Sequence, residues 1–232
     1  MSEREAIVLA GGFGTRLRPV VSDVPKPMAP IAGRPFLEIL LTHLARKGVH
    51  RVILSVGFMS EKIVGHFGNR FAGMDLDYAV EEHPLGTGGA VKAALGHCEG
   101  DHAFVFNGDT YLDLEVSRLD ACWTARRCPL IVGREVADTS RYGRLITVEG
   151  RVVGFEEKGK AGPGLINAGC YVLPTDILMA VPAETFSLES DFLSREIGRR
   201  RFELFVTGGD FIDIGIPEDF QRAQVELPSA ST

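Results

Sequence analysis

A glycine-rich run that follows a short apolar stretch constrains this chain more than any other feature. Residues 6–9 are typical of a buried strand. Three glycines occupy the next five positions: Gly11, Gly12 and Gly14. Because glycine has no Cβ, the backbone amides of such a loop can approach a ligand closely. Thr15, Arg16 and Lys26 add a hydroxyl and two cations. Together these groups favour a polyphosphate ligand, of which a nucleoside triphosphate is the commonest.

The spacing of these glycines excludes two familiar phosphate-binding loops. A dinucleotide fingerprint counted from Gly12 needs a glycine where Leu17 stands. The nearest match to a P-loop, residues 154–161, ends in Ala161, which has no hydroxyl to offer magnesium. A glycine-rich turn without a ligand is the alternative, and the cations close to the loop argue against it.

Composition and charge narrow the class of protein further. With 232 residues, 45% of them hydrophobic, the chain is expected to form one domain. A net charge of −6 argues against nucleic acid or a membrane as partner. Its four cysteines lack zinc or redox spacing, which predicts free thiols in a reducing cytoplasm. Neither a signal peptide nor a membrane-spanning apolar run is predicted.

Apolar runs alternate with helical patterns through the first half, as in α/β proteins. Strands are predicted at 7–9, 52–56, 76–80 and 103–106, and helices from Pro35 to 44 and over 90–95. This alternation predicts a mostly parallel sheet that binds ligands at the carboxyl ends of its strands. The glycine-rich loop and residues 107–109 (Asn-Gly-Asp) both follow strands, so we expect them to face one crevice.

The second half is richer in strand patterns. They are predicted at 130–133, 144–148, 152–156, 170–173, 204–206 and around 212, with a hairpin turn at 149–150. A helix is predicted over 190–199 and another from Pro217, and residues 228–232 are expected to fray.

Residues 9–38 resemble the signature of the sugar-1-phosphate nucleotidyltransferases. The similarity continues through residues 84–89, 107–109, 157–158, 167–169 and Asp213. Within that family, the short length and the strings at 186–193 and 211–220 are most similar to the D-glycero-α-D-manno-heptose 1-phosphate guanylyltransferases.

The resemblance implies a fold and a reaction. The fold is a single Rossmann-like (GT-A-like) α/β domain, 1–227, with a mixed, mostly parallel sheet flanked by helices. A nucleotide-binding half, 1–112, precedes a sugar-binding half, 113–227, and a flexible tail, 228–232. The reaction joins GTP to a sugar 1-phosphate and releases pyrophosphate, and a homodimer is compatible with it. Positioning and charge stabilisation are expected to supply most of the rate.

The resemblance also implies roles for individual residues. Asp109 and Asp213 each end an apolar run and match the family's metal-binding aspartates, and Mg²⁺ is commonly held by one or two carboxylates. Arg16 and Lys26 are expected to neutralise the triphosphate. The expected nucleotide-binding residues are Leu9, Ala10, Gly11, Gly12, Gly14, Thr15, Glu81, Gly86, Thr87, Asn107 and Gly108. The expected sugar-phosphate-binding residues are Tyr142, Gly143, Glu157, Lys158, Asn167 and Gly169.

Several alternatives stay open at this stage. Glu82 could replace Glu81 in reading guanine. Mannose 1-phosphate could replace the heptose, or a uridylyltransferase could run the same chemistry. A glycosyltransferase is a different class, but it normally needs an Asp-x-Asp motif, and residues 107–109 offer one carboxylate. A nucleotide sensor without turnover is the last alternative.

Overall fold

Four parallel strands form the N-terminal half of a ten-stranded sheet. The computed structural model describes residues 4–12, 14, 17, 21, 23–156 and 159–230. The parallel strands are β1 (Glu5–Leu9), β4 (Arg51–Val56), β6 (Met74–Val80) and β7 (His102–Asn107), and their order is β7-β1-β4-β6. The short β5 (Arg70–Phe71) pairs antiparallel with β6 at the edge. The predicted strands of this half all form.

The other half of the sheet is mainly antiparallel. Its strands are β9 (Leu130–Val136), β10 (Arg144–Val148), β11 (Arg151–Glu156), β12 (Gly164–Pro174) and β13 (Glu203–Thr207). Their order is β10-β11-β13-β9-β12, and β12 pairs antiparallel with β7. Only β13 and β9 run parallel here. The sheet is therefore mixed, as expected, but the parallel arrangement is confined to the first half and this pair. The tight turn Glu149–Gly150, both at positive φ, joins β10 directly to β11 without a helical crossover.

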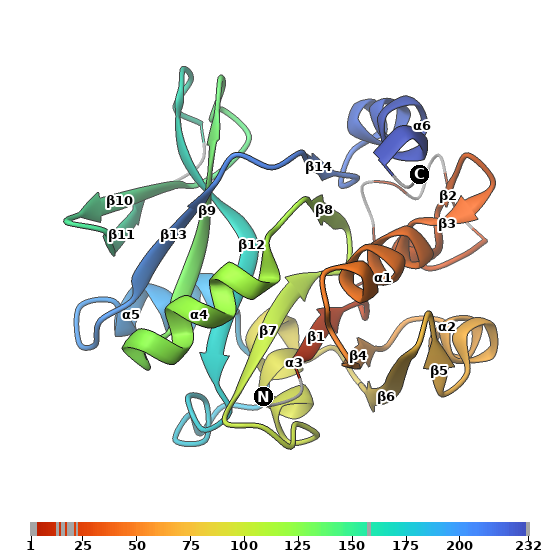
Figure 1. The fold of residues 1–232 in the computed structure, drawn as a ribbon, viewed down its shortest axis with the longest axis horizontal. Helices are drawn as coiled ribbons and strands as arrows, with labels where there is room; N and C mark the ends of the chain where they lie inside the picture. Colours follow the sequence, from red (N-terminus) through yellow and green to blue (C-terminus); the bar gives the residue numbers. More distant parts are fainter. Residues whose placement is uncertain are drawn as a thin grey trace.

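Helices cover both faces of the sheet (Figure 1). One apolar cluster joins the sheet to α1 (Phe36–Arg46), α2 (Ser60–Phe67), α4 (Val116–Arg126) and α6 (Pro217–Ala230). The other joins it to α3 (Gly86–Leu95) and the segment before α5 (Ser194–Glu196). Along β1, Ala6 and Val8 belong to the first cluster and Ile7 to the second. Burial on both faces explains why β1 is continuously apolar.

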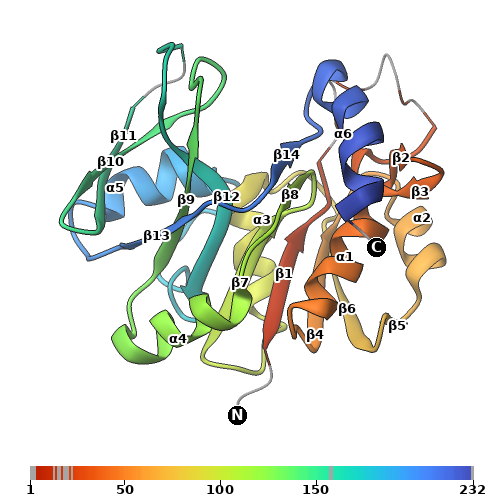
Figure 2. The ribbon, with the colours of Figure 1, turned by 45° about the horizontal axis from the view of Figure 1, so that its top comes forward.

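A two-stranded sheet brings the end of the chain back to the N-terminal half. It consists of β8 (Thr110–Leu112) and β14 (Phe211–Asp213), paired antiparallel beyond the end of β7 (Figure 2). A second small sheet pairs β2 (Pro30–Ile31) with β3 (Arg34–Pro35), and a 3₁₀ turn, η1, spans Lys26–Met28. Sequence patterns indicated β14 but not its partner.

Several helices differ from the sequence prediction, and α3 begins at Gly86 rather than at residue 90. Pro35 is the residue before α1, which begins at Phe36. The helix expected over 190–199 is a π-helical turn, η2 (Leu188–Leu193), followed by the short α5. α6 extends to Ala230, three residues into the expected tail. The boundary proposed at 112/113 stays a prediction, and the sheet runs through it from β7 to β12.

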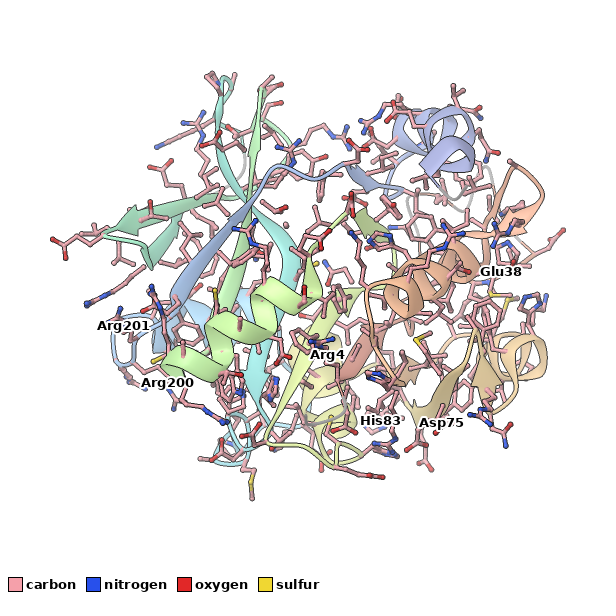
Figure 3. All side chains as sticks on the ribbon, in the orientation of Figure 1. Arg4, Glu38, Asp75, His83, Arg200 and Arg201 are labelled. Atoms are coloured by element: carbon pink, nitrogen blue, oxygen red, sulfur yellow. The ribbon has the colours of Figure 1, made fainter. Side chains whose placement is uncertain are left out.

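Charged side chains lie mostly at the periphery. Figure 3 shows Asp75 and Arg200, for example, at the outer edge of the molecule, and both are exposed. Within the described part of the chain, no helix is long and apolar enough to cross a membrane.

Candidate active site

A cavity of about 430 Å³ lies at the carboxyl ends of the parallel strands. Leu9 ends β1 and Asn107 ends β7, and both line the cavity. Its other lining residues are Gly11, Gly12, Gly14, Lys26, Pro27, Glu81, Pro84, Gly86, Thr87, Ala90, Asp109 and Gly215. The glycine-rich loop and the strand end at 107–109 therefore face one crevice, as the alternation of strands and helices predicted.

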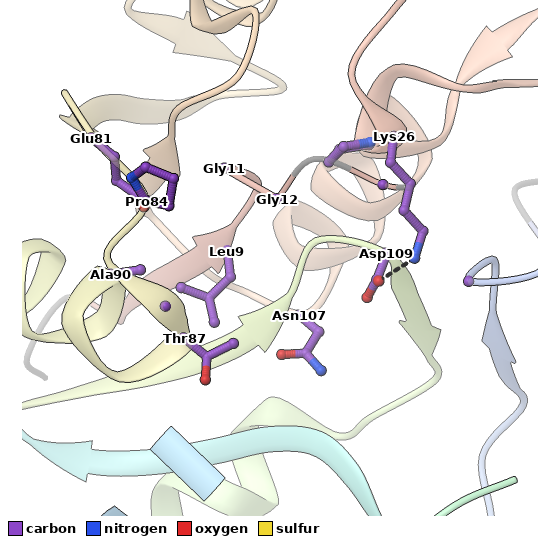
Figure 4. A pocket seen from close by; sticks show the side chains of 14 residues that line it. Leu9, Gly11, Gly12, Lys26, Glu81, Pro84, Thr87, Ala90, Asn107 and Asp109 are labelled. Carbon is purple, nitrogen blue, oxygen red and sulfur yellow. Dashed lines mark hydrogen bonds and ion pairs between the residues drawn. The ribbon is translucent and has the colours of Figure 1, made fainter. Parts of the chain in front are cut away.

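The cavity has two chemically different ends (Figure 4). Gly11 and Gly12 lie between them. Glu81 lies on one side of these glycines, whereas Lys26 and Asp109 lie on the other. A base with hydrogen-bond donors suits the first end, and a phosphate chain with a cation suits the second.

Lys26 reaches the carboxylate of Asp109. The lysine ammonium pairs with Asp109 Oδ2, and the two side chains are 9% and 33% exposed. Pro25 and Pro27 flank Lys26 in the turn η1, which fixes the direction of its backbone. Gly14, at φ +58°, packs on this lysine, and a Cβ there would lie 2.7 Å from Lys26 Cβ. Only glycine meets both conditions without strain.

Asp213 comes from the strand that pairs with the segment after Asp109. In the β14–β8 register Asp213 faces Thr110, and the Ile214 amide donates to the Asp109 carbonyl at 3.0 Å. The Gly215 amide donates to Asp213 Oδ1 at 2.7 Å. Gly215 lines the first cavity and Asp213 lines a second one. Strand pairing thus places the backbone of Asp213 beside the segment that begins at Asp109, although the two are far apart in the sequence.

Asp109 and Asp213 carry carboxylates, the type of ligand that a divalent ion shared with a substrate uses. In the described part of the chain, no group of three or more His, Cys, Asp or Glu side chains could hold a metal ion. A complete protein cage, as calcium or structural zinc would need, is therefore not formed by these residues. Mg²⁺ usually takes one or two carboxylates and fills its other positions with water and phosphate oxygens.

Glu81 is oriented by two hydrogen bonds. Its Oε1 accepts from the Ser55 hydroxyl at 3.0 Å, and its Oε2 accepts from the Leu85 amide at 3.1 Å. The carboxylate packs against Gly11, where a Cβ would lie 2.4 Å from Oε1. Each oxygen keeps a further lone pair for a ligand. Glu82, the alternative left open by the sequence, is exposed and is not among the lining residues.

Thr87 lies in the first turn of α3, and its hydroxyl is already engaged. It donates to Glu189 Oε2 at 2.9 Å and accepts from the Leu188 amide at 2.9 Å. With its hydrogen committed, this hydroxyl has only a lone pair to offer a ligand. Gly86 lies beside it and lines the cavity too.

A second cavity, of about 860 Å³, adjoins the first at Asn107, which lines both. It is lined by Thr110, Tyr142, Gly143, Phe155, Glu156, Asn167, Ala168, Gly169, Tyr171, Glu189, Ser190, Ser194, Phe211 and Asp213. Gly169, at φ +69°, lets β12 pass close to Asn107, because a Cβ there would lie 2.3 Å from Asn107 Nδ2.

The predicted sugar-binding residues that the structure describes all line this second cavity: Tyr142, Gly143, Asn167 and Gly169. Burial raises the pKa of Tyr142, so its phenol keeps its proton at neutral pH. Glu157 and Lys158 lie outside the described residues, as do Thr15 and Arg16.

Two predicted nucleotide-binding residues hold the loop without lining either cavity. The Ala10 amide donates to the Ser55 carbonyl at 2.7 Å. The Gly108 amide donates to the Leu9 carbonyl at 2.9 Å. These backbone hydrogen bonds connect the carboxyl end of β1 with those of β4 and β7.

Sequence reasoning missed several polar residues of the second cavity, among them Tyr171 and Glu189. The Tyr171 hydroxyl donates to Glu189 Oε1 at 3.1 Å and accepts from Asn167 Nδ2 at 2.8 Å. Burial, with the nearby Glu189 charge, raises the pKa of Tyr171 well above its usual value. Glu189 lies in the string at 186–193, which contributed only to the resemblance and indicated no contact with Thr87 or Tyr171.

The class of protein follows from comparison with known families. The Nucleotidyl transferase family model matches residues 5–229. The chain belongs to this family, which confirms the family expected from the glycine-rich signature and the α/β fold expected with it.

Individual members of the family are similar to this chain over nearly its whole length. The chain is 41% identical to D-glycero-α-D-manno-heptose 1-phosphate guanylyltransferase of Aneurinibacillus thermoaerophilus over 225 residues, 96% of this chain and 98% of that protein. It is 39% identical over 218 residues to the enzyme of the same name from Campylobacter jejuni, covering 93% of this chain and 96% of that one. The crystal structure of HddC from Yersinia pseudotuberculosis complexed with GMP-PN superposes with a TM-score of 0.85 at 40% identity, covering 95% of this chain and 98% of that chain.

Proposed function

We propose that this protein is a D-glycero-α-D-manno-heptose 1-phosphate guanylyltransferase. It joins GTP and heptose 1-phosphate to give GDP-heptose and pyrophosphate. The observation that carries the proposal is the pair of adjoining cavities, one lined by the glycine-rich loop and one by hydroxyl, amide and carboxylate groups, with Asp109 on the first and Asp213 on the second. Relatives that carry this name cover nearly the whole chain.

The first cavity holds GTP in this proposal. Glu81 accepts from guanine N1–H and the 2-amino group, which uracil does not offer. The amides around Gly11, Gly12 and Gly14 approach the phosphates, and Lys26 neutralises their charge. Arg16 and Thr15 belong to the same loop in sequence and are proposed to assist.

The second cavity holds the sugar phosphate. Tyr142, Gly143, Asn167 and Gly169 line it and contact the sugar, and Glu157 and Lys158 are proposed to grip a hydroxyl and the phosphate. An oxygen of the sugar phosphate attacks the α-phosphorus of GTP, forming one P–O bond while the bond to the leaving pyrophosphate breaks. The attacking phosphate is ionised at neutral pH, so no general base is required.

Asp109 and Asp213 are proposed to hold Mg²⁺. A divalent ion there would reduce the repulsion between the two anionic substrates. The chain's own residues align them: Lys26 and the loop amides fix the triphosphate, and the second cavity directs the attacking oxygen. Positioning and electrostatic stabilisation then supply the rate.

We further propose that the enzyme works in the cytoplasm, where GTP is available. All four cysteines are free, which agrees with a reducing compartment. A homodimer stays a prediction.

A substrate matrix tests the proposal. Each of GTP, ATP, CTP and UTP is incubated with heptose 1-phosphate, mannose 1-phosphate or glucose 1-phosphate in Mg²⁺, and released pyrophosphate is measured. The highest kcat/KM is expected for GTP with heptose 1-phosphate. A preference for mannose 1-phosphate would replace the sugar assignment, and a preference for UTP would replace the base. Absence of pyrophosphate from every pair would contradict nucleotidyl transfer.

A further inference from the structure

The carboxylate of Glu189 lines the second cavity and accepts hydrogen bonds from three hydroxyls, one of them on a residue of the first cavity. Thr87 and Ser187 donate to Oε2 at 2.9 and 3.3 Å, and Tyr171 donates to Oε1 at 3.1 Å. Thr87 lines the first cavity, whereas Tyr171 and Glu189 itself line the second. The half-buried carboxylate thus has neutral donors on both of its oxygens.

No cation neutralises this carboxylate among the residues that the structure describes. Each ion pair in that part of the chain, including those of Glu196 and Glu203 nearby in sequence, excludes Glu189. A partly buried carboxylate without a cation is costly, and three hydroxyl hydrogens aimed at it recover part of that cost. In the described part of the chain, the Glu189 carboxylate is therefore held by the geometry of three hydroxyl donors rather than by an ion pair.

Hydrogen bonds within its own turn also hold Glu189 in place. It lies in the π-helical turn η2, a rare conformation that is frequent at functional sites. The Ser187 hydroxyl caps this turn by accepting from the Ser190 amide. The Ser194 hydroxyl donates to the Glu189 carbonyl at 2.8 Å.

An ionised carboxylate can only accept hydrogen bonds, and this fixes the direction of every bond next to it. Tyr171 must give its hydrogen to Glu189, so the phenol oxygen can only accept from Asn167. The side-chain amide of Asn167 must therefore turn its NH₂ group toward Tyr171. Its Oδ1 then accepts from the Gly169 amide at 3.1 Å, as observed.

We propose that Glu189 is a positioning and specificity residue, which by way of Tyr171 holds the Asn167 amide in the second cavity in the same orientation that the Gly169 amide requires. Asn167 then presents one N–H donor and one carbonyl lone pair to the ligand in a fixed arrangement. A polyhydroxyl ligand must match this pattern with an acceptor and a donor at defined positions. The identification of that ligand as a sugar phosphate rests on the proposed function.

The substitution Glu189→Gln keeps the size of the side chain, but a glutamine amide can donate hydrogen bonds as well as accept them. This amide can donate to Tyr171 or Thr87, so the phenol can turn its hydrogen away from position 189, and the Asn167 amide is then held only by its bond from the Gly169 amide. We expect the KM for the sugar phosphate to rise about tenfold, as loss of one good hydrogen bond would cause, with the KM for GTP changed less than about twofold. Asp191→Asn, in the same turn and with the same loss of charge, is the matched control and should leave both KM values unchanged.

A double-mutant cycle separates the relay from simple support of the fold. Tyr171→Phe removes the middle hydroxyl and should raise the sugar-phosphate KM as Glu189→Gln does, and the double variant should be no worse than either alone. Fully additive effects, or equal losses for GTP and for the sugar phosphate, would overturn the proposal. So would a wild-type sugar-phosphate KM in Glu189→Gln.

A measurement on the ligand-free protein tests the role of Glu189 independently of the proposed function. In the ligand-free protein, the Asn167 NH₂ protons should show nuclear Overhauser effects to the Tyr171 ring and slow exchange. Both signals should weaken in Glu189→Gln and persist in Asp191→Asn. If the wild type released no pyrophosphate, the proposed function would fail while this measurement still decided the role of Glu189. An Asn167 amide unchanged by Glu189→Gln would overturn that role.

Discussion

The ammonium group of Lys26 pairs with the carboxylate of Asp109, 83 residues away in the sequence. The pair joins the turn η1 to the segment after β7, at the cavity end opposite Glu81 (Figure 4). A group proposed to neutralise phosphate thus contacts a group proposed to hold a metal ion. When a divalent ion binds Asp109, we expect Lys26 to transfer its contact to the triphosphate.

Asp109→Asn should reduce turnover about 10³-fold, the scale of losing a charged group that stabilises the transition state. The side chain is one-third exposed and is not part of either apolar cluster, so the fold should be retained. Pyrophosphate release and the melting temperature, measured together, check both halves of this expectation. Undiminished turnover would remove Asp109 from the metal site.

Gly14→Ala should weaken GTP binding through Lys26. The new Cβ would lie 2.7 Å from Lys26 Cβ at a backbone φ of +58°, so the lysine must move. We expect a loss of stability of about 1 kcal/mol from the strained backbone, with a clear rise in the KM for GTP.

Gly33→Ala is the matched control for this substitution. Gly33 also has a positive φ, of +83°, but nothing lies within 4 Å of a Cβ there. It should lose comparable stability and keep its affinity for GTP. Equal GTP effects in the two variants would mean that strain alone, rather than the displacement of Lys26, is responsible.

Glu81→Gln should relax the choice of base. The glutamine can still accept from Ser55, but it presents an N–H where guanine also presents donors. We expect the preference for GTP over UTP in kcat/KM to fall by at least about tenfold. Glu82→Gln, next in sequence and exposed, should leave the preference unchanged. Identical base discrimination in wild type and Glu81→Gln would assign guanine recognition to another group.

Lys158→Ala should raise the KM for the sugar phosphate far more than the KM for GTP. The reason is the proposed contact between this lysine and the phosphate of the sugar, since loss of a hydrogen bond to a charged group costs about 1.5–3 kcal/mol. Initial rates measured with each substrate varied in turn provide the test. Equal changes in both KM values would contradict the role.

Much of the fold was predictable because its signals are local. β1, β4 and β7 are continuously apolar since each is buried on both faces, and the sequence predicted all three to within a residue or two. The antiparallel half was predicted as strands but not as an arrangement, because pairing between β9, β12 and β13 depends on contacts between distant segments. α4 was not predicted, although its buried Val116, Leu119 and Trp123 follow a helical spacing.

In the candidate site too, residues with local sequence signals were predictable, whereas residues placed by contacts between distant segments were not. Asp109 and the loop glycines follow strands, so their meeting at the sheet edge could be inferred from the order of the elements. Glu189 could not be placed in this way. Its partners Thr87 and Tyr171 are 102 and 18 residues away, and the helix predicted over 190–199 gave no sign of the π-helical turn in which Glu189 lies.

The most direct test of the account is to measure the pyrophosphate released from GTP when heptose 1-phosphate is added. The measurement is made on the wild type and on Asp213→Asn over a range of Mg²⁺ concentrations. We expect release matched by GDP-heptose in the wild type, none after chelation of the metal, and a strongly reduced rate in the variant at every Mg²⁺ concentration. Release that persists in chelator, or an Asp213→Asn variant as active as the wild type, would contradict the account.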